Sequence, residues 1–84
     1  QDRLPGKSLV HGVLLGPHSV AVSDDVLTVG EPVVADLGGV TVDLVRDPDG
    51  GVRAVRRDTE AELIVRTAYW FAWSTYFPRT AVID

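Results

Sequence analysis

The sequence predicts a small α+β domain dominated by β-structure, in which two or three hairpins form a small curled antiparallel sheet packed on one short aromatic helix. Two observations lead to this prediction. Along most of the chain, short runs rich in valine and leucine alternate with turns that contain glycine, proline or aspartate. Near the C-terminus, all the aromatic side chains recur at helical spacing within one short segment.

The length of the chain limits it to one domain. A chain of 84 residues forms a single thin core, because a chain of this size buries only about 60–65% of the surface that its unfolded form exposes. We expect a lead-in segment over residues 1–7 and one β-rich domain over residues 8–84. The chain contains no methionine, so its first residue is not an initiator and we expect a processed product or a segment of a longer protein.

The first predicted hairpin is followed by a helical turn. Aliphatic and β-branched residues dominate residues 8–15, the pair Gly16-Pro17 interrupts them, and the strand pattern resumes over residues 18–22. Ser23-Asp24-Asp25 has the composition of a helix N-cap followed by acids in the first turn. We therefore expect a tight hairpin and then one helical turn, which Gly30 ends.

Four further strands are predicted from the same alternation of apolar runs and turns. The clearest is the segment 40–46, in which Val40, Val42 and Leu44 share one face and polar residues share the other. The strongest turn signal follows it, because Asp, Pro and Gly gather within five residues. The four strands span residues 32–36, 40–46, 52–57 and 63–66, and turns are expected at residues 37–39, 47–51 and 58–62.

The aromatic segment predicts a short helix. All six aromatic residues of the protein lie between positions 69 and 77, and at 100° per residue five of them fall within an arc of about 120°. We expect this stripe to face the core, with Trp70, Trp73 and Phe77 as structural core residues. Pro78 is expected to end the helix, and residues 79–83 to form the last strand. The five residues of the stripe are Tyr69, Trp70, Trp73, Tyr76 and Phe77.

Three residues are predicted to bind a partner protein or another copy of the chain. Phe71 falls opposite the aromatic stripe, next to small residues that leave its ring uncovered, and exposed aromatic side chains often anchor interfaces. Val82 and Ile83 are predicted to lie at an unpaired strand edge, which is a template for pairing with another chain. The alternative is that the strands wrap the helix on both sides, so that Phe71 belongs to the core.

The composition excludes several classes of protein. Cysteine is absent, which rules out disulfides, thiolate nucleophiles and iron–sulfur clusters. Eight basic residues against twelve acidic ones give a net charge of −4, and acids surround the arginine cluster of residues 53–57, so we expect no nucleic-acid partner. No apolar run approaches the roughly 18 residues that a membrane span needs.

No metal or cofactor is expected. A two-residue turn between His11 and His18 places the two imidazoles four strand positions apart, at about 13 Å, which is too far for a shared zinc ion. The segment 47–50 has the composition of the start of a calcium loop, but Arg53 follows where further oxygen ligands are required. Turn chemistry is therefore the favoured interpretation of this segment.

No catalytic constellation is visible in the sequence. The serines lie outside any nucleophile-elbow motif, and no pair of Asp or Glu lies in an apolar segment that would separate their pKa values. The glycine pair Gly38-Gly39 opens a predicted strand, whereas a phosphate-binding loop opens a helix. We therefore expect that the chain is not an enzyme.

The order of several motifs resembles a known family. Val10-His11-Gly12-Val13 is followed by the strand at Val20-Ala21-Val22 and the segment 33–42 with its acid and glycine pair. Tyr69-Trp70-Phe71-Ala72-Trp73 then runs into Phe77-Pro78-Arg79-Thr80. This order resembles the C-terminal half of the prokaryotic family known as domain of unknown function 3179, over residues 7–57 and 67–83. The closing aromatic motif is the most specific part of the resemblance.

The sequence departs from the family pattern at three places. Val22-Ser23 stands where the family tends to have Tyr-Pro, Ala35 stands in place of an Asn, and Arg79 stands in place of an Asp. The other half of the family often carries a Cys-Pro-x-Cys stretch, which does not occur in these 84 residues, so its chemistry does not transfer. The resemblance implies a prokaryotic protein that is exported or associated with the cell envelope.

The expected function follows from these observations together. We expect a non-catalytic interaction or structural module that binds a protein partner or associates with itself, as a small subunit or segment of a larger envelope-associated or filamentous assembly. The alternative is half of a substrate- or metal-handling domain that needs a missing partner half.

Overall fold

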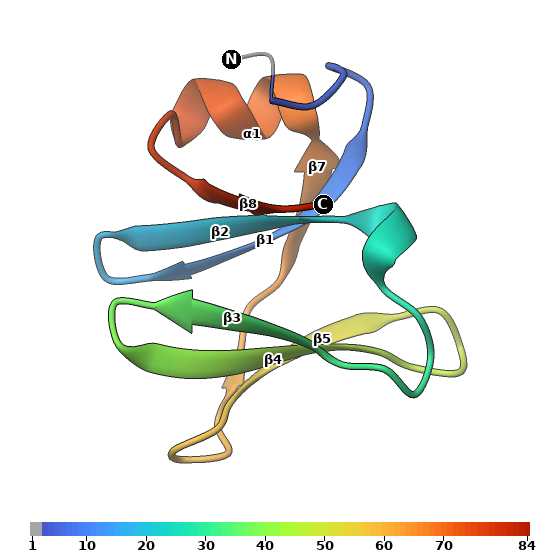
Figure 1. Ribbon diagram of the computed structural model, residues 1–84, viewed down its shortest axis with the longest axis vertical. Coiled ribbons are helices and arrows are strands. Elements are labelled where there is room, and N and C mark those ends of the chain that lie inside the picture. The colour runs from blue at the N-terminus through green and yellow to red at the C-terminus, as the bar shows by residue number, and fades with distance from the viewer. Residues whose placement is uncertain (1–2) are drawn as a thin grey trace.

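Two β-sheets and one helix form three layers (Figure 1). The structure is a computed structural model that describes residues 3–84. Helix α1 (Trp70–Tyr76) covers one face of the first sheet, and the second sheet packs against the other face. The predicted fold class, α+β with mostly β-structure, is confirmed. The strands form two sheets, however, where the sequence predicts one, and the first sheet is not antiparallel throughout, because the C-terminal strand joins it in parallel.

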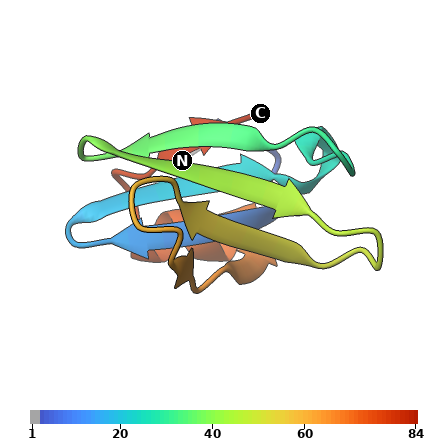
Figure 2. The same ribbon diagram turned by 90° about the horizontal axis from the view of Figure 1, so that it is seen from below.

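Each sheet has four strands. The second sheet is antiparallel throughout, and its strands β3, β4 and β5 lie side by side in the view from below (Figure 2). The first sheet has the order β7 (Arg66–Tyr69), β1 (Leu9–Leu15), β2 (His18–Ser23) and β8 (Ala81–Ile83). The second sheet has the order β3 (Val33–Leu37), β4 (Val40–Arg46), β5 (Val52–Arg56) and β6 (Glu62–Leu63).

The β1–β2 hairpin explains why two layers are needed to cover the first sheet. Its register pairs Leu15 with His18 across Gly16-Pro17, as predicted, and Gly16 adopts a φ of 58°. Apolar side chains then point to both faces of the hairpin, because successive residues of a strand alternate. Val13 faces the second sheet, whereas Val10 faces the helix. A sheet with two apolar faces is stable only when both are covered.

The two covered faces form two separate cores. The inter-sheet core contains only aliphatic residues, and the helix-side core is built around two tryptophans. The buried residues of the inter-sheet core are Val13, Val20, Val22, Leu27, Ala35, Leu37, Val42, Leu44 and Ala54. The buried residues of the helix-side core are Val10, Ala21, Trp70 and Trp73.

The predicted strand over residues 63–66 is wrong in its bounds. The chain instead forms β6, which pairs with β5, and then β7, which pairs with β1 in the other sheet. Ile64 and Val65 lie between them and carry the chain from one sheet to the other. The division arises because Leu63 packs against the inter-sheet core, while Arg66 pairs with Gly12 in the first sheet.

The helical turn after β2 also differs from the prediction. It is a 3₁₀ turn over Asp24–Val26 and ends well before Gly30. The Ser23 hydroxyl donates to a carboxylate oxygen of Asp25 at 2.7 Å and does not cap the backbone. The turn ends early because Leu27 adopts an extended conformation and inserts its side chain into the inter-sheet core.

Two residues of the predicted aromatic stripe do not face the core. Tyr69 and Tyr76 are 52% and 79% exposed, whereas Trp70 and Trp73 are 0% and 3% exposed. Tyr69 is the last residue of β7 and therefore does not follow the helical periodicity. Tyr76 lies on the side of α1 that faces β7, where the neighbouring Ala68 is too short to cover its ring.

Candidate functional site

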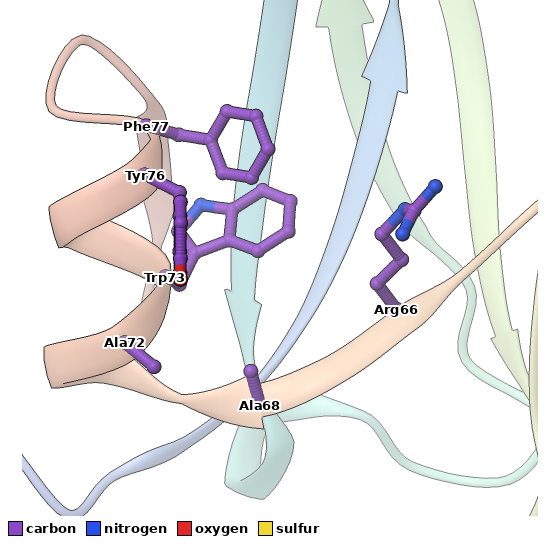
Figure 3. A pocket seen from close by; sticks show the side chains of 6 residues that line it. All are labelled: Arg66, Ala68, Ala72, Trp73, Tyr76 and Phe77. Carbon is purple, nitrogen blue, oxygen red and sulfur yellow. The ribbon is translucent and has the colours of Figure 1, made fainter.

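A groove of about 360 Å³ opens between α1 and β7 on the helix side of the first sheet. The indole of Trp73 and the ring of Phe77 reach out from the helix, and the side chain of Arg66 rises opposite them from β7 (Figure 3). Between them, Ala68 and Ala72 contribute only methyl groups, which leaves the space open. The lining residues are Arg66, Ala68, Ala72, Trp73, Tyr76 and Phe77.

The helix wall of the groove is held by Trp73. Its indole lies directly on Gly12 of β1, where an added Cβ would come 2.1 Å from the ring. Its Nε1 donates to the hydroxyl of Thr80 at 3.1 Å, and its ring centroid lies 4.4 Å from that of Phe77. A wall fixed in this way is preformed, so that a ligand does not have to order it.

Arg66 is a free positive charge in an otherwise apolar groove. Of the seven arginines in the sequence, Arg66 and Arg79 have side chains that form no ion pair or hydrogen bond with any residue between 3 and 84, and only Arg66 lines the groove. The arginines with such contacts are Arg3, Arg46, Arg53, Arg56 and Arg57.

Strand β7 forms one edge of the first sheet. The backbone N–H of Trp70 donates to the carbonyl of Ser8 at 2.8 Å, which fixes which residues of the strand face β1. Backbone groups point alternately to the two sides of a strand in an antiparallel ladder. The N–H and C=O groups of Ala68 therefore point toward β1, and those of Thr67 and Tyr69 point away from the sheet. Within the described chain no strand pairs with this outer edge.

A second hollow continues the groove past Arg66. It also measures about 360 Å³ and is lined by residues of β1, β6 and the β6–β7 connection. Ile64 is 77% exposed beside it. Its lining residues are Leu14, Glu62, Leu63, Ile64 and Arg66. Arg66 therefore stands between two hollows, of which the first is mostly apolar and the second is lined by three apolar residues and by Glu62.

A polar cluster around the buried His11 lies elsewhere, at the end of the inter-sheet core. The Nε2 atom of His11 lies 2.7 Å from Oδ1 of Asp24, and its Nδ1 lies 3.0 Å from the hydroxyl of Thr67. Arg46 donates to the same oxygen of Asp24 at 2.6 Å. A carboxylate only accepts hydrogen bonds, so Nε2 carries the hydrogen. The imidazole of His11 and the guanidinium of Arg46 lower the pKa of Asp24.

This polar cluster has the hydroxyl, imidazole and carboxylate of a hydrolytic triad, but it does not lie in a pocket that could hold a substrate. A triad works in a pocket that holds the substrate beside the hydroxyl, and neither hollow described above is lined by Thr67 or His11. The carboxylate of Asp24 is also shared with Arg46 of the second sheet. We interpret the cluster as a polar connection between β1, β7, the 3₁₀ turn and β4.

The predicted partner-binding residues lie in different parts of the first layer. Phe71 is 57% exposed and stacks on Tyr69, with ring centroids 6.2 Å apart. Val82 and Ile83 lie in β8, the edge strand opposite β7, where they pair with Ala21 and Val22 of β2. Their side chains are partly buried against the two cores. The structure therefore does not bring the three residues into one surface.

The predicted core residues of the helix all contact the helix-side core. Trp70 and Trp73 are buried in it, and Phe77 is partly buried against it. The Nε1 atom of Trp70 has no hydrogen-bond partner among residues 3–84. The guanidinium carbon of Arg3 lies 5.2 Å from the centre of its ring, at the distance of a cation–π contact.

The turns that resemble ion sites are occupied by protein contacts. Asp49 accepts a hydrogen bond from the N–H of Gly51 at 2.8 Å, and Arg53 binds the carboxylate of Asp47. His18 lies at the hairpin turn, with its ring against Gly38. Between residues 3 and 84, no three His, Cys, Asp or Glu side chains lie close enough to hold a metal ion.

No helix within residues 3–84 has the length and apolar character of a membrane span.

Comparisons with protein-family models, with curated proteins and with solved structures find no match for this chain. The resemblance to domain of unknown function 3179 therefore stays a prediction.

The sequence analysis missed the groove because its residues carry no motif. Arg66 lies in a segment predicted to be a plain strand, and Tyr76 is predicted to be buried. The one available signal is the pair of alanines at 68 and 72, which are small residues in an otherwise aromatic segment. The polar cluster carries no local signal either, because Thr67 and His11 are 56 positions apart.

Proposed function

We propose that this domain is a non-catalytic interaction module that binds a partner protein with the face formed by α1 and β7. The observation that supports the proposal most directly is the apolar groove beside an unpaired strand edge. The unpaired backbone groups of a strand edge are a template for pairing with another chain, and the groove beside this edge offers a place for a side chain of that chain.

The exposed ring of Tyr76 supports the same face. Tyr76 lines the groove and is 79% exposed, whereas the stacked pair of Tyr69 and Phe71 lies outside the groove, where β7 leads into α1. Tyrosine is enriched among the residues that contribute most to binding energy.

The wider role that we propose is that of a subunit or segment in a larger assembly. This part of the proposal comes from the resemblance to a prokaryotic family and includes an exported or envelope-associated location. The alternative function, half of a substrate- or metal-handling domain, has no observation in its favour beyond the resemblance and stays a prediction.

A photo-crosslinking experiment tests the proposed face. A photoreactive amino acid replaces Ala72 inside the groove, and in a control chain it replaces Thr59, an exposed residue of the β5–β6 turn. Both chains are irradiated in an extract of the source cells, and the adducts are identified by mass spectrometry. We expect one defined adduct from position 72 that is absent from position 59.

A second variant shows whether the adduct depends on the face itself. Tyr76→Ser removes an aromatic ring that is 79% exposed, so the melting temperature should not change. The proposal requires that this variant lose the adduct from position 72. Equal adducts from both positions, no adduct at all, or an adduct that Tyr76→Ser does not reduce would each contradict it.

A further inference from the structure

We infer that the partner contributes an extended segment that adds to the outer edge of β7. In this segment an Asp or Glu faces Arg66. Apolar residues lie two positions before and two positions after this acidic residue. This inference rests on the proposed function and specifies the chemistry of its partner. The same segment of the partner would fill the groove, pair with the strand edge and bind the guanidinium of Arg66.

The backbone of β7 provides the first part of the argument. Thr67 and Tyr69 point their N–H and C=O groups outward, which is the pattern that an added strand needs. The backbone groups that an edge strand leaves unpaired bind an extended peptide in β-augmentation. Both residues are exposed, so a partner reaches this edge without rearrangement of the domain.

The spacing of side chains provides the second part. Arg66 and Ala68 lie two positions apart on β7 and face the helix side, where both line the groove. An added strand has the same period of two residues. Its residue beside Ala68 therefore points toward the space under Tyr76, and its residue beside Arg66 points toward the guanidinium. The first position requires an apolar side chain and the second requires a carboxylate.

The charge of Arg66 explains why the partner is acidic. Arginine and carboxylate form charge-assisted and often bidentate hydrogen bonds. The other arginine cluster, Arg53, Arg56 and Arg57, already uses its charges on Asp47, Asp58 and Asp43. The side chain of Arg66 is exposed and has no such partner among the described residues, so its charge is available to a carboxylate of the partner.

The second hollow indicates an internal acidic residue rather than a chain terminus. Past Arg66 the surface continues into the hollow beside Leu14 and Ile64. A terminal carboxylate at Arg66 would leave this hollow empty, whereas an internal residue lets the chain continue into it. The recognised pattern is therefore apolar, any residue, acidic, any residue, apolar.

Peptide binding to the full chain tests the inference. The probe is a fluorescein-labelled peptide with a blocked C-terminus and the sequence Thr-Leu-Thr-Glu-Thr-Leu-Thr, and the matched control replaces Glu with Gln. Fluorescence anisotropy measures both affinities. We expect saturable binding of the Glu peptide and binding of the Gln peptide that is weaker by about 10-fold, because a charge-assisted contact is lost.

Two pairs of variants separate the side-chain contact from the backbone contact. Arg66→Gln should weaken binding of the Glu peptide by about 10-fold, while Arg79→Gln, which removes the other unpaired arginine, should not. Tyr69→Pro removes an outward N–H at a residue whose φ of −76° already suits proline. Tyr69→Ala removes the same ring but keeps the N–H. The additional loss of peptide affinity in Tyr69→Pro therefore measures the contribution of the backbone contact.

Amide hydrogen exchange gives a readout in the unmodified chain. The amides of Thr67 and Tyr69 should exchange more slowly when the Glu peptide is bound. The inference is overturned if the peptide does not bind, if the Gln peptide or Arg66→Gln binds equally well, or if these two amides gain no protection. Such a result together with a groove-dependent crosslink from position 72 would leave the proposed face intact and exclude only the extended acidic segment.

Discussion

The two cores on either side of the β1–β2 hairpin stabilise the domain in different ways. The inter-sheet core contains nine buried aliphatic residues, none larger than leucine, and strands of both sheets contribute to it. The helix-side core has only four buried residues, and two of them are tryptophans from one short helix. The buried apolar surface of the inter-sheet core thus comes from many small side chains, whereas most of that of the helix-side core comes from two tryptophans.

This difference indicates which core is more sensitive to substitution. A core of many small side chains loses little when one of them is shortened, because its neighbours retain most of their contacts. A core built around two large rings loses most of its contacts when one ring is removed. The groove between α1 and β7 lies on the sensitive side, because Trp73 belongs to the helix-side core and also forms the wall of the groove.

The largest effect that we expect is that of Trp73→Ala. Truncating a buried aromatic residue costs about 3–5 kcal/mol, whereas Val42→Ala in the inter-sheet core removes two carbon atoms and should cost about 2 kcal/mol. The free energy of unfolding, measured with urea for both variants, tests the comparison. Equal losses in the two variants would show that the helix-side core does not have the special role argued above.

Gly12→Ala tests how closely Trp73 sits on the sheet. The new methyl group would come 2.1 Å from the indole, and overpacking of this kind costs about 1–3 kcal/mol. Gly6→Ala is the matched control, because its new methyl group would lie at an ordinary distance of 3.5 Å from Phe71. We expect thermal unfolding to show a clear loss for Gly12→Ala and almost none for Gly6→Ala.

The polar cluster at the end of the inter-sheet core should make the stability of the domain depend on pH. Hydrogen bonds from His11 and then from Arg46 lower the pKa of Asp24 below its ordinary value of 3.8. The charged carboxylate is therefore favoured in the folded state. Its contribution is fully present above the unfolded pKa and is lost as the pH falls through the lower folded pKa.

Asp24→Asn removes this pH dependence and a modest part of the stability. Because the Asp24 side chain is 39% exposed, we expect a loss of only about 1 kcal/mol at neutral pH. The variant and the parent should converge only as the pH falls below the ordinary value of 3.8 and through the lower folded pKa of Asp24, because the parent then loses the charge as well. Urea unfolding at several pH values measures both effects, and curves that stay parallel down to low pH would contradict the role of Asp24.

Phe71→Ser should have the smallest effect on stability and a larger one on association. The ring is 57% exposed, so the free energy of unfolding should change by no more than about 0.5 kcal/mol. If Phe71 helps dock a partner or a second copy, size exclusion with light scattering should show the loss of an assembly peak. A variant that melts many degrees lower would instead place Phe71 in a core.

Local signals in the sequence determined the fold class and several elements. Gly16-Pro17 set the register of the first hairpin, and the alternation of residues 40–46 predicted β4 and its buried face. The aromatic segment predicted α1 because residues three and four apart meet on one face of a helix. These features depend on neighbours in the chain, so that the sequence displays them directly.

The way in which these elements combine depends on contacts between distant parts of the chain. The parallel pairing of β8 with β2 and the division of residues 63–66 between two sheets join segments far apart in the sequence. The groove exists because Trp73 rests on Gly12 while Ala68 is too short to fill the space beside it. Such features depend on which distant side chains come to lie next to each other, and no local periodicity or turn signal encodes that choice.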